Sequence, residues 1–536
     1  SSGVVEMSCL PDNERFDLAS PHVCSSIDNI RETADFYYRL TQNETISVSG
    51  LGDRYYTQCA TEFFAERKLP IPQELLSEMD RMSSHMTMGL FPEIRRAYVT
   101  IDCDIYLWSY DNDSDLAVFD GVPNTVMRLC LAKPRPNVFQ GEIQCVLMIG
   151  TVADLLLYGM REVDGEGISL IPQPFFKVSL DGGVIGPIVS TDNGRIFFTI
   201  KNTLSEFVYQ NAKGWRRAAS CQRVDRSTSL FDSLCSYIIP ITDEIEEVVV
   251  DESRHILFTL THENAIQVFD LGSSGEDCSK ICTVEGNRII AEATNLTGGQ
   301  HESSFFSHIV TISAVPATES RFFNLVAVTT KGVRLYFSCL PRPSQPANAA
   351  HGQYLQIASS VMCESECRPV QLRLVHVRFP PPGVCPPSLF PDARRGVYAA
   401  HINSSLCAVT ATKSDTVWAT SDLYTPSSRF FTETSSEVRV EGNIWGMWSG
   451  REALMKTPRP GSGMIAALEA HSFHSLQSHL PQRLMLLTDT ALHVICHRSP
   501  LDALREALSQ TVGYESAETS RLCFFLGALD TLVLSL

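Results

Sequence analysis

Short apolar runs separated by tight polar turns recur along most of this chain. The clearest stretch is Val248–Leu271, VVVDESRHILFTLTHENAIQVFDL. Its first apolar run ends at the turn Asp251–Ser253, a second covers Ile256–Leu260, and a third alternates apolar with polar residues over Ile266–Leu271. This pattern predicts three antiparallel strands in a meander. One small sheet cannot cover both of its faces, so it needs neighbours of its own kind.

Six further stretches have the same form. Pro187–Tyr209 carries the hairpin signal Asp192-Asn193-Gly194, and Leu325–Ser338 turns at Lys331-Gly332. The remaining stretches are Ala97–Tyr110, Cys145–Met160, Gly396–Trp418 and Arg483–His497. Seven meanders spaced roughly forty to eighty residues apart predict a mainly β fold, a seven-bladed β-propeller. The spacing is uneven and no Trp-Asp signature recurs, which argues against a regular WD or kelch array.

The two ends of the chain have a different pattern. We expect residues 1–90 to form an N-terminal arm that is first extended and then helical over 27–40, 55–69 and 72–82. Pro72 suits a first helical position, and apolar residues follow it at helical spacing. The propeller is expected over 91–498, with a long Pro- and Ser-rich insertion at 341–369. From 499 to 536 the period becomes helical, which predicts the first helices of an α-solenoid.

Composition limits the possible functions. The chain has 536 residues, a formal net charge of -18 and a pI of about 5.2, which works against direct nucleic-acid binding. Its 17 cysteines follow no disulfide framework, which indicates reduced, buried thiols. No run reaches the ~20 apolar residues of a spanning helix. The chain begins at Ser1 without Met and ends in apolar residues, so we expect a piece of a longer protein.

Motifs of catalysis are missing from the sequence. It contains no GxSxG, P-loop, GxGxxG after a strand, or HExxH motif. CxxxC or HxxH spacing occurs without a second half at zinc-finger distance at Cys278/Cys282, Cys363/Cys367 and His471/His474. We therefore expect neither a metal site nor a cofactor. Acidic residues are expected at corresponding turns of the repeats, at Asp102, Asp192 and Asp251. Turn formation is the favoured interpretation, and a catalytic carboxylate cluster is the alternative.

One connector has an amphipathic pattern. On a helix, Ser229–Ile239 would have one apolar face and an opposite face rich in serine. The predicted membrane-contact residues are Leu230, Phe231, Leu234, Tyr237, Ile238 and Ile239. A basic patch lies just upstream, at Lys213, Arg216, Arg217, Arg223 and Arg226. Such a segment suits insertion at a curved bilayer surface, where packing defects admit apolar side chains. The alternatives are a helix that folds back onto its own blade and an outer strand.

Several sequence blocks resemble one protein family. They are FPEIRRAYVTIDCDIYLWSY (91–110), STDNGRIFF (190–198), AIQVFDLG (265–272), VTTKGVRLYFS (328–338), LVHVRFPP (374–381) and SPLDALREAL (499–508). These blocks resemble the large non-FG inner-ring scaffold nucleoporins, and the similarity covers nearly the whole chain from about Arg31. That resemblance implies an N-terminal seven-bladed propeller followed by a long α-solenoid.

The resemblance also implies a function. Members of the family are structural constituents of the nuclear pore complex at the nuclear envelope, and their propeller faces the pore membrane. A loop between blades three and four is thought to touch lipid, and Ser229–Ile239 lies at the matching place. Implied partners are a linker nucleoporin, other inner-ring nucleoporins and integral pore-membrane proteins. The alternatives are a vesicle-coat propeller–solenoid protein and, less favoured, a propeller enzyme that carries a carboxylate cluster.

Overall fold

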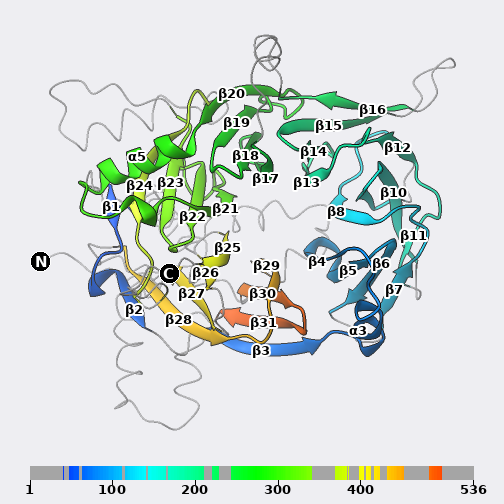
Figure 1. Ribbon diagram of the computed structural model, residues 1–536, viewed down its shortest axis with the longest axis horizontal. Coiled ribbons are helices and arrows are strands. Elements are labelled where there is room, and N and C mark those ends of the chain that lie inside the picture. Colours follow the sequence, from blue (N-terminus) through cyan, green and yellow to red (C-terminus); the bar gives the residue numbers. More distant parts are fainter. Residues whose placement is uncertain are drawn as a thin grey trace, which may run out of the picture.

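The chain folds into a ring of seven small sheets around a central axis, as the seven predicted meanders require (Figure 1). The computed structural model describes residues 40, 47–58, 63–110, 115–139, 143–163, 167–210, 220–227, 243–340, 368–382, 384, 397–403, 406–411, 416–422, 431–451 and 482–497. The core of each sheet is an antiparallel meander, and the first strands of neighbouring blades touch in a closed circle, which defines a seven-bladed β-propeller.

Each blade corresponds to one of the predicted stretches. Blade 1 contains β4 (Met86–Phe91), β5 (Arg96–Ile101), β6 (Asp104–Ser109) and β7 (Leu116–Phe119). Blade 2 contains β8 (Val126–Ala132), β9 (Cys145–Thr151), β10 (Asp154–Val163) and β11 (Gly167–Leu170), with β12 (Phe176–Ser179) also paired to β10. Blade 3 contains β13 (Ile185–Ser190), β14 (Ile196–Ile200), β15 (Thr203–Gln210) and β16 (Ser220–Asp225).

The next three blades repeat the arrangement. Blade 4 contains β17 (Ile245–Asp251), β18 (Ile256–Thr261), β19 (Ile266–Asp270) and β20 (Ser279–Val284). Blade 5 contains β21 (Ile309–Ala314), β22 (Leu325–Thr329), β23 (Arg334–Ser338) and β24 (Arg373–Arg378). Blade 6 contains β25 (Val397–Asn403), β26 (Leu406–Ala411), β27 (Thr416–Asp422) and β28 (Glu433–Arg439). The hydrophobic core lies mainly in the seams between neighbouring blades, where apolar side chains of both sheets interdigitate.

The last blade is shared between the two ends of the described chain. Its inner strands are β29 (Ile444–Arg451), β30 (Gln482–Thr488) and β31 (Ala491–His497), and its outer strand is β3 (Phe63–Pro70). β3 runs antiparallel to β31, from Phe63 opposite His497 to Pro70 opposite Ala491. In Figure 1 the blue β3 therefore lies beside the orange β31. Because the two ends of the described chain share one sheet, the ring can open at this blade only if the ladder between β3 and β31 breaks.

A short N-terminal segment continues this closure around the rim. β1 (Val48–Ser49) adds in parallel to β24 of blade 5, and β2 (Tyr56–Gln58) adds in parallel to β28 of blade 6. We call residues 47–58 the strap. Between the strands the strap makes a 3-10 turn at Asp53–Tyr55, and comparable single turns occur at Pro92–Ile94 and Ser303–Phe305. With β3, the strap contacts three consecutive blades.

The expected N-terminal helical arm is only partly correct. The helix expected at 72–82 is present as α3 (Gln73–Met79), with Pro72 at its N-cap and Leu75 fully buried. The helix expected at 55–69 is wrong, because the described residues of this range lie at the end of a 3-10 turn, in β2 and in β3. Backbone pairing with β31 and burial of Phe63 outweigh the local helical pattern. The propeller sheets therefore begin at β1, well before the expected residue 91. The expected helix at 27–40 lies outside the described residues except for Leu40.

Buried charges hold the strap in place. Glu433 of blade 6 accepts hydrogen bonds from Arg334 (2.8 Å to Nη1) and from Arg378 (2.8 Å to Nε), both on blade 5. All three side chains are at most 4% exposed. Burial alone would raise the pKa of Glu433, but the two guanidinium groups outweigh it and hold the pKa at about 2. The cluster is therefore ionised, with one positive charge in excess.

The strap supplies the groups that accommodate this excess charge. Arg378 donates to Ser49 Oγ at 3.0 Å and to the Tyr55 carbonyl at 3.3 Å. Arg334 donates to the Tyr56 hydroxyl at 3.1 Å, and that hydroxyl donates to the Phe379 carbonyl. The Arg378 guanidinium also lies over aromatic rings, at 5.0 Å from the Tyr56 centroid. Removing the strap would leave buried guanidinium N–H groups without these acceptors.

Closure of the ring can be tested at Phe63. Its side chain is 4% exposed, packs against residues of blades 6 and 7, and stacks on His497 with ring centroids 4.7 Å apart. We expect Phe63→Ala to lower the free energy of unfolding by about 3–5 kcal/mol, through lost burial and a cavity in the closing sheet. Chemical denaturation followed by circular dichroism measures this change. The matched control is Lys68→Ala on the same strand, whose side chain is 47% exposed and which should leave stability unchanged.

The charge cluster gives a second stability prediction. Glu433→Gln leaves two buried guanidinium groups without their carboxylate, so we expect unfolding to become easier by about 3–5 kcal/mol. Glu437→Gln on the same strand is the control, because Glu437 is exposed and its change should stay within about 0.5 kcal/mol. The pKa of Glu433 is lowered on folding, so its contribution is complete above its ordinary pKa and is lost as pH falls toward 2. The difference in free energy of unfolding between the parent and Glu433→Gln should therefore become smaller in acid. A difference that does not change with pH would contradict the ionised state assigned to Glu433.

Candidate functional site

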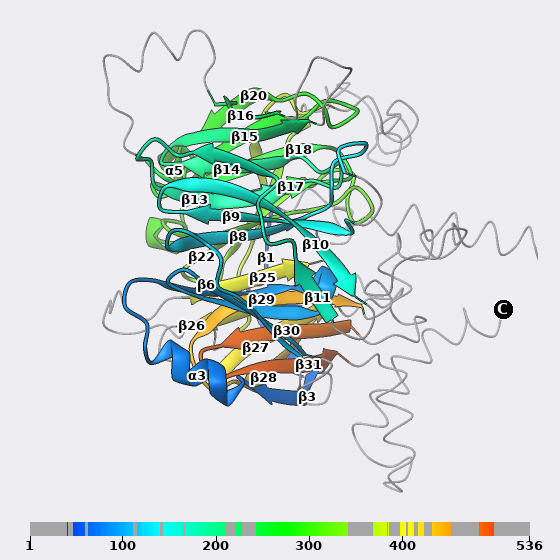
Figure 2. The same ribbon diagram turned by 90° about the vertical axis from the view of Figure 1, so that its right-hand side faces the viewer.

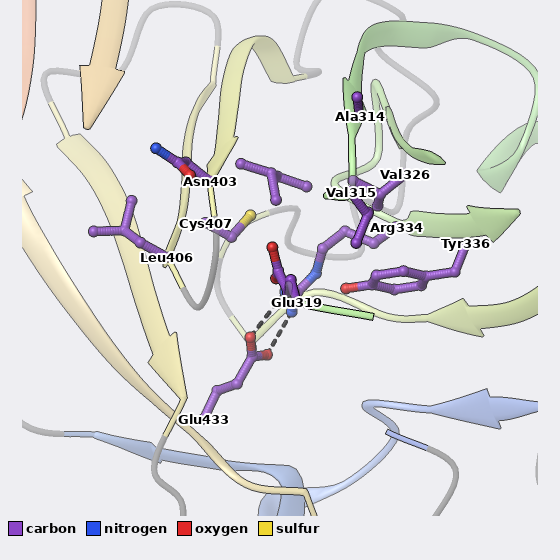
Figure 3. Close-up of a pocket in the computed structure, with 11 residues that line it drawn as sticks. Ala314, Val315, Glu319, Val326, Arg334, Tyr336, Asn403, Leu406, Cys407 and Glu433 are labelled. Carbon is purple, nitrogen blue, oxygen red and sulfur yellow. Dashed lines mark hydrogen bonds and ion pairs between the residues drawn. The ribbon is translucent and has the colours of Figure 1, made fainter. Parts of the chain in front are cut away.

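A small cavity lies beside the charge cluster, between blades 5 and 6 (Figure 3). It is lined by Ala314, Val315, Glu319, Val326, Arg334, Tyr336, Ile402, Asn403, Leu406, Cys407 and Glu433. Its free volume is about 20 Å³, room for about one water molecule and far below the ~300 Å³ of a ligand pocket. Burial raises the pKa of the Cys407 thiol, which suppresses the reactive thiolate at neutral pH. The cavity is therefore a small packing gap in the seam between blades 5 and 6, and it is too small to hold a substrate.

The three turn aspartates do not form a carboxylate cluster. Asp192 follows the first strand of blade 3 and Asp251 ends the first strand of blade 4. Asp102 lies between β5 and β6, at the opposite end of the strands. The expectation that they occupy corresponding turns is therefore wrong for Asp102. Its carboxylate accepts the backbone N–H groups of residues 83–85, which lowers its pKa to about 2. Asp251 likewise accepts the Ser253 N–H at 3.0 Å. Turn formation by the aspartate side chain is confirmed for Asp251, whereas the Asp102 carboxylate ties its turn to the distant segment 83–85.

Metal ligands do not gather in the described part of the chain. Within it, no group of three or more His, Cys, Asp or Glu side chains is placed to hold a metal ion. Cys278 and Cys282 are unpaired thiols on or beside β20, while Cys363, Cys367, His471 and His474 lie outside the described residues. Burial raises the pKa of Cys278 to about 11, so this thiol stays protonated at neutral pH. The candidate site is therefore sought on the outer surface of the ring, where partners could bind.

The two faces of the ring differ. α3 and α5 (Gly286–Leu296) both lie in connectors that lead from the outer strand of one blade to the first strand of the next. Figure 2 shows both helices on the same side of the disc, at the left. We call this side the helical face. It also carries the turns between the second and third strands of each blade. Neither helix is long and apolar enough to cross a bilayer.

The amphipathic connector leaves from the helical face. Leu230, Phe231, Leu234, Tyr237, Ile238 and Ile239 lie outside the described residues, but both ends of their connector are described. Before it, Arg226 N–H donates to the Leu204 carbonyl at 2.8 Å. After it, Ile245 N–H donates to the Lys201 carbonyl at 2.9 Å. Both bonds tie the connector to the β14–β15 turn of blade 3, so its ends are held close to the face of the ring.

The expected basic patch is divided by β16. Arg226 lies at the end of β16 that faces the connector, but it forms an ion pair with the buried Glu206 at 2.6 Å. Arg195 also binds Glu206, at 2.7 Å, and the two guanidinium groups outweigh burial and lower the pKa of Glu206. Arg223 is exposed on β16. Lys213, Arg216 and Arg217 lie outside the described residues, in the segment that precedes β16.

This division separates the basic segment from the amphipathic one. The segment 211–219 joins β15 to β16, whereas the connector begins at the other end of β16. A six-residue strand is roughly 20 Å long, so the two segments start at opposite faces of the ring. Sequence proximity suggested a single lipid-binding unit, and strand direction was the missing information. Sequence reasoning also missed the strap and its charge cluster, because Arg334, Arg378 and Glu433 converge only through blade packing.

The sequence of this chain is similar to those of known nuclear pore proteins. The chain is 28% identical over 504 residues to the nuclear pore complex protein Nup154 of Drosophila melanogaster, covering 88% of this chain and 35% of that protein. A probable nucleoporin of Schizosaccharomyces pombe is 27% identical over 483 residues, with 83% and 35% covered. The chain thus spans about a third of the length of these relatives. Their names favour the nucleoporin hypothesis over the vesicle-coat and enzyme alternatives.

A solved structure has the same fold. The crystal structure of the Chaetomium thermophilum Nup170 N-terminal domain in complex with Nup53 matches with a TM-score of 0.74 at 19% identity, covering 94% of this chain and 71% of that one. The family described as Nup133 N terminal like matches residues 60–445, which include all seven blades in whole or in part. The chain therefore belongs to the nucleoporin family with a Nup133-like N-terminal region.

Proposed function

We propose that this chain is the propeller part of a structural, non-enzymatic scaffold of the nuclear pore complex inner ring, at the nuclear envelope. The observation that carries the proposal is membership of the nucleoporin family across the propeller itself, over residues 60–445. The relatives named above as nuclear pore proteins support the location. In this role the propeller performs no reaction, and its value lies in a rigid outer surface that positions partners.

The seams of the ring support a rigid surface. Arg195 of blade 3 donates to the Gly275 carbonyl (2.7 Å) and the Asp277 carbonyl (2.6 Å) beside blade 4. Arg254 of blade 4 donates to the Val315 carbonyl beside blade 5 at 2.8 Å. Charged donors of this kind, shielded from water, hold neighbouring blades in one relative position. Partners that dock on two blades then meet a preformed surface, which lowers the ordering cost of binding.

The proposed partners are a linker nucleoporin, other inner-ring nucleoporins and integral pore-membrane proteins. Support comes from the Chaetomium thermophilum Nup170 N-terminal domain, which has been crystallised in complex with Nup53. A propeller of this fold can thus bind another nucleoporin. No cofactor, metal or nucleic acid takes part in the proposed function.

The connector between blades 3 and 4 is proposed to add lipid contact. Its apolar residues Leu230, Phe231, Leu234, Tyr237, Ile238 and Ile239 would enter the bilayer interface from the helical face. Burial of about four large apolar side chains contributes several kcal/mol, at ~1.5–3 kcal/mol each before ordering costs. A contribution of that size is weak for one copy and sufficient when many copies in a ring act together.

The location can be tested in cells. A fluorescently tagged chain should concentrate at the nuclear rim and overlap with a pore marker, because scaffold contacts retain it there. The charge-cluster variant Glu433→Gln, which weakens the fold, should show less rim signal at equal expression. Diffuse cytoplasmic fluorescence of a folded parent chain would contradict the nuclear pore assignment.

Lipid contact can be tested in vitro. We expect Leu230→Asp combined with Phe231→Asp to abolish flotation with small vesicles, because both changes place charge on the predicted apolar face. The matched control is Ser229→Asp combined with Ser233→Asp, which adds the same charge to the opposite face and should retain most binding. Thermal unfolding of all variants checks that the propeller stays folded. Equal flotation of parent and Leu230→Asp/Phe231→Asp would refute the proposed contact.

A further inference from the structure

Two exposed valines stand on the helical face next to the blade 3–4 connector. Val152 is at the β9–β10 turn of blade 2 and is 51% exposed, and Val184 immediately precedes β13 and is 63% exposed. A single exposed apolar residue needs no explanation. These two are different because they belong to one continuous piece of surface. We call this surface, formed by residues 152–153, 180–184 and 200–202, the turn strip.

Hydrogen bonds fix the first half of the turn strip. Leu180 N–H donates to the Ala153 carbonyl at 2.8 Å, which joins the segment that carries Val184 to the turn that carries Val152. Gly183 N–H then donates to the Leu180 carbonyl at 2.9 Å. Inside the β9–β10 turn, the Asp154 N–H donates to Thr151 Oγ1 at 2.9 Å. Both valines therefore project from backbone that is already ordered, so their burial elsewhere incurs little loss of conformational freedom.

The second half of the turn strip reaches the connector. Ile185, next to Val184, pairs with Ile200 across the β13–β14 ladder. The following residue, Lys201, accepts the Ile245 N–H at 2.9 Å, at the point where the connector returns to blade 4. The two valines, the β14–β15 turn and both described ends of the connector thus share one face of blades 2 and 3. A flat surface that meets the connector there would meet the turn strip as well.

The charge around the valines is balanced. Lys177 pairs with Asp154 at 2.9 Å, and the exposed Lys201 and Asp181 contribute one charge of each sign. On the blade 4 side of the connector the exposed Glu244, Glu246 and Glu263 give an acidic surface, in which the exposed His262 pairs with Glu246 at 2.6 Å. An anionic surface would be repelled by the acidic residues on the blade 4 side, and the balanced charges around the valines would not attract it. The turn strip therefore suits a lipid bilayer whose headgroups carry little net charge. Insertion into such a bilayer depends more on the apolar area buried than on charge.

We infer that Val152 and Val184 insert into the interface of a lipid bilayer, so that the helical face of blades 2 and 3 lies against the membrane. This inference rests on the proposed lipid contact and extends it to two residues with fixed positions. It also orients the disc: the opposite face, which carries the turns at Asp192 and Asp251, points away from the bilayer.

Vesicle flotation tests the inference. The assay uses the full chain with small phosphatidylcholine vesicles, at low and high salt. Val152→Asp combined with Val184→Asp should reduce the bound fraction by about tenfold, because each change removes an apolar contact and brings a charge to the interface. Binding of the parent should not change with salt. The matched control is Val118→Asp on β7, at the outer edge of blade 1, whose side chain is 56% exposed; it should bind like the parent.

The possible outcomes distinguish lipid contact by the turn strip from lipid contact by the connector. Normal flotation of the Val152→Asp/Val184→Asp variant, together with loss for Leu230→Asp/Phe231→Asp, overturns the turn strip and leaves the connector contact standing. An equal loss for Val118→Asp also overturns it, since the effect would then be one of general charge. A parent chain that fails to float with any vesicle overturns both proposals. Thermal unfolding of each variant separates loss of binding from loss of fold.

Discussion

The pairing of β3 with β31 is the interaction on which the rest of this structure depends. A propeller blade contacts only its two neighbours, so the positions of all surface turns follow from closure of the circle. Here closure is made by a backbone ladder and by an ion pair between Glu66 of β3 and Arg483 of β30 at 2.6 Å. Turns that lie on different blades can act as one surface because this ladder fixes their relative positions.

The buried ionic cluster serves a different purpose from closure. Apolar residues of similar size could fill the space between blades 5 and 6 at no loss of stability. Glu433, Arg334 and Arg378, however, need particular acceptors and donors, and the strap provides several of them. A slip of the strap by one residue would misplace Ser49 and Tyr56. The buried guanidinium groups of Arg334 and Arg378 would then lose these hydrogen-bond acceptors. We interpret the cluster as a device that selects one register for a short, weakly paired segment.

Strand periodicity was sufficient to predict the seven blades, because the inner strands of every blade follow one another closely in the sequence. Val248–Leu271 shows this well: the strands and turns expected there are β17, β18 and β19 with their two turns. Residues 55–69 could not be predicted in the same way. Their partner strands lie far along the chain, since β2 pairs with β28 and β3 with β31, and the local pattern favoured a helix. For the candidate site, the amphipathic residues Leu230–Ile239 remain a prediction, while the turn strip required knowledge of which turns share a face.

The shared seventh blade has a consequence for biosynthesis. Glu66 and Arg483 are 417 residues apart in the sequence, and a ribosome adds roughly 5–20 residues per second. The first-made strand must therefore wait on the order of 20–80 s before its partner emerges. During that time β3, which carries Phe63 and Phe64, lacks its partner strand β31, while six blades form behind it. An unpaired strand edge can pair with other chains, so shielding of the N-terminal strand during this interval would favour ring closure over aggregation.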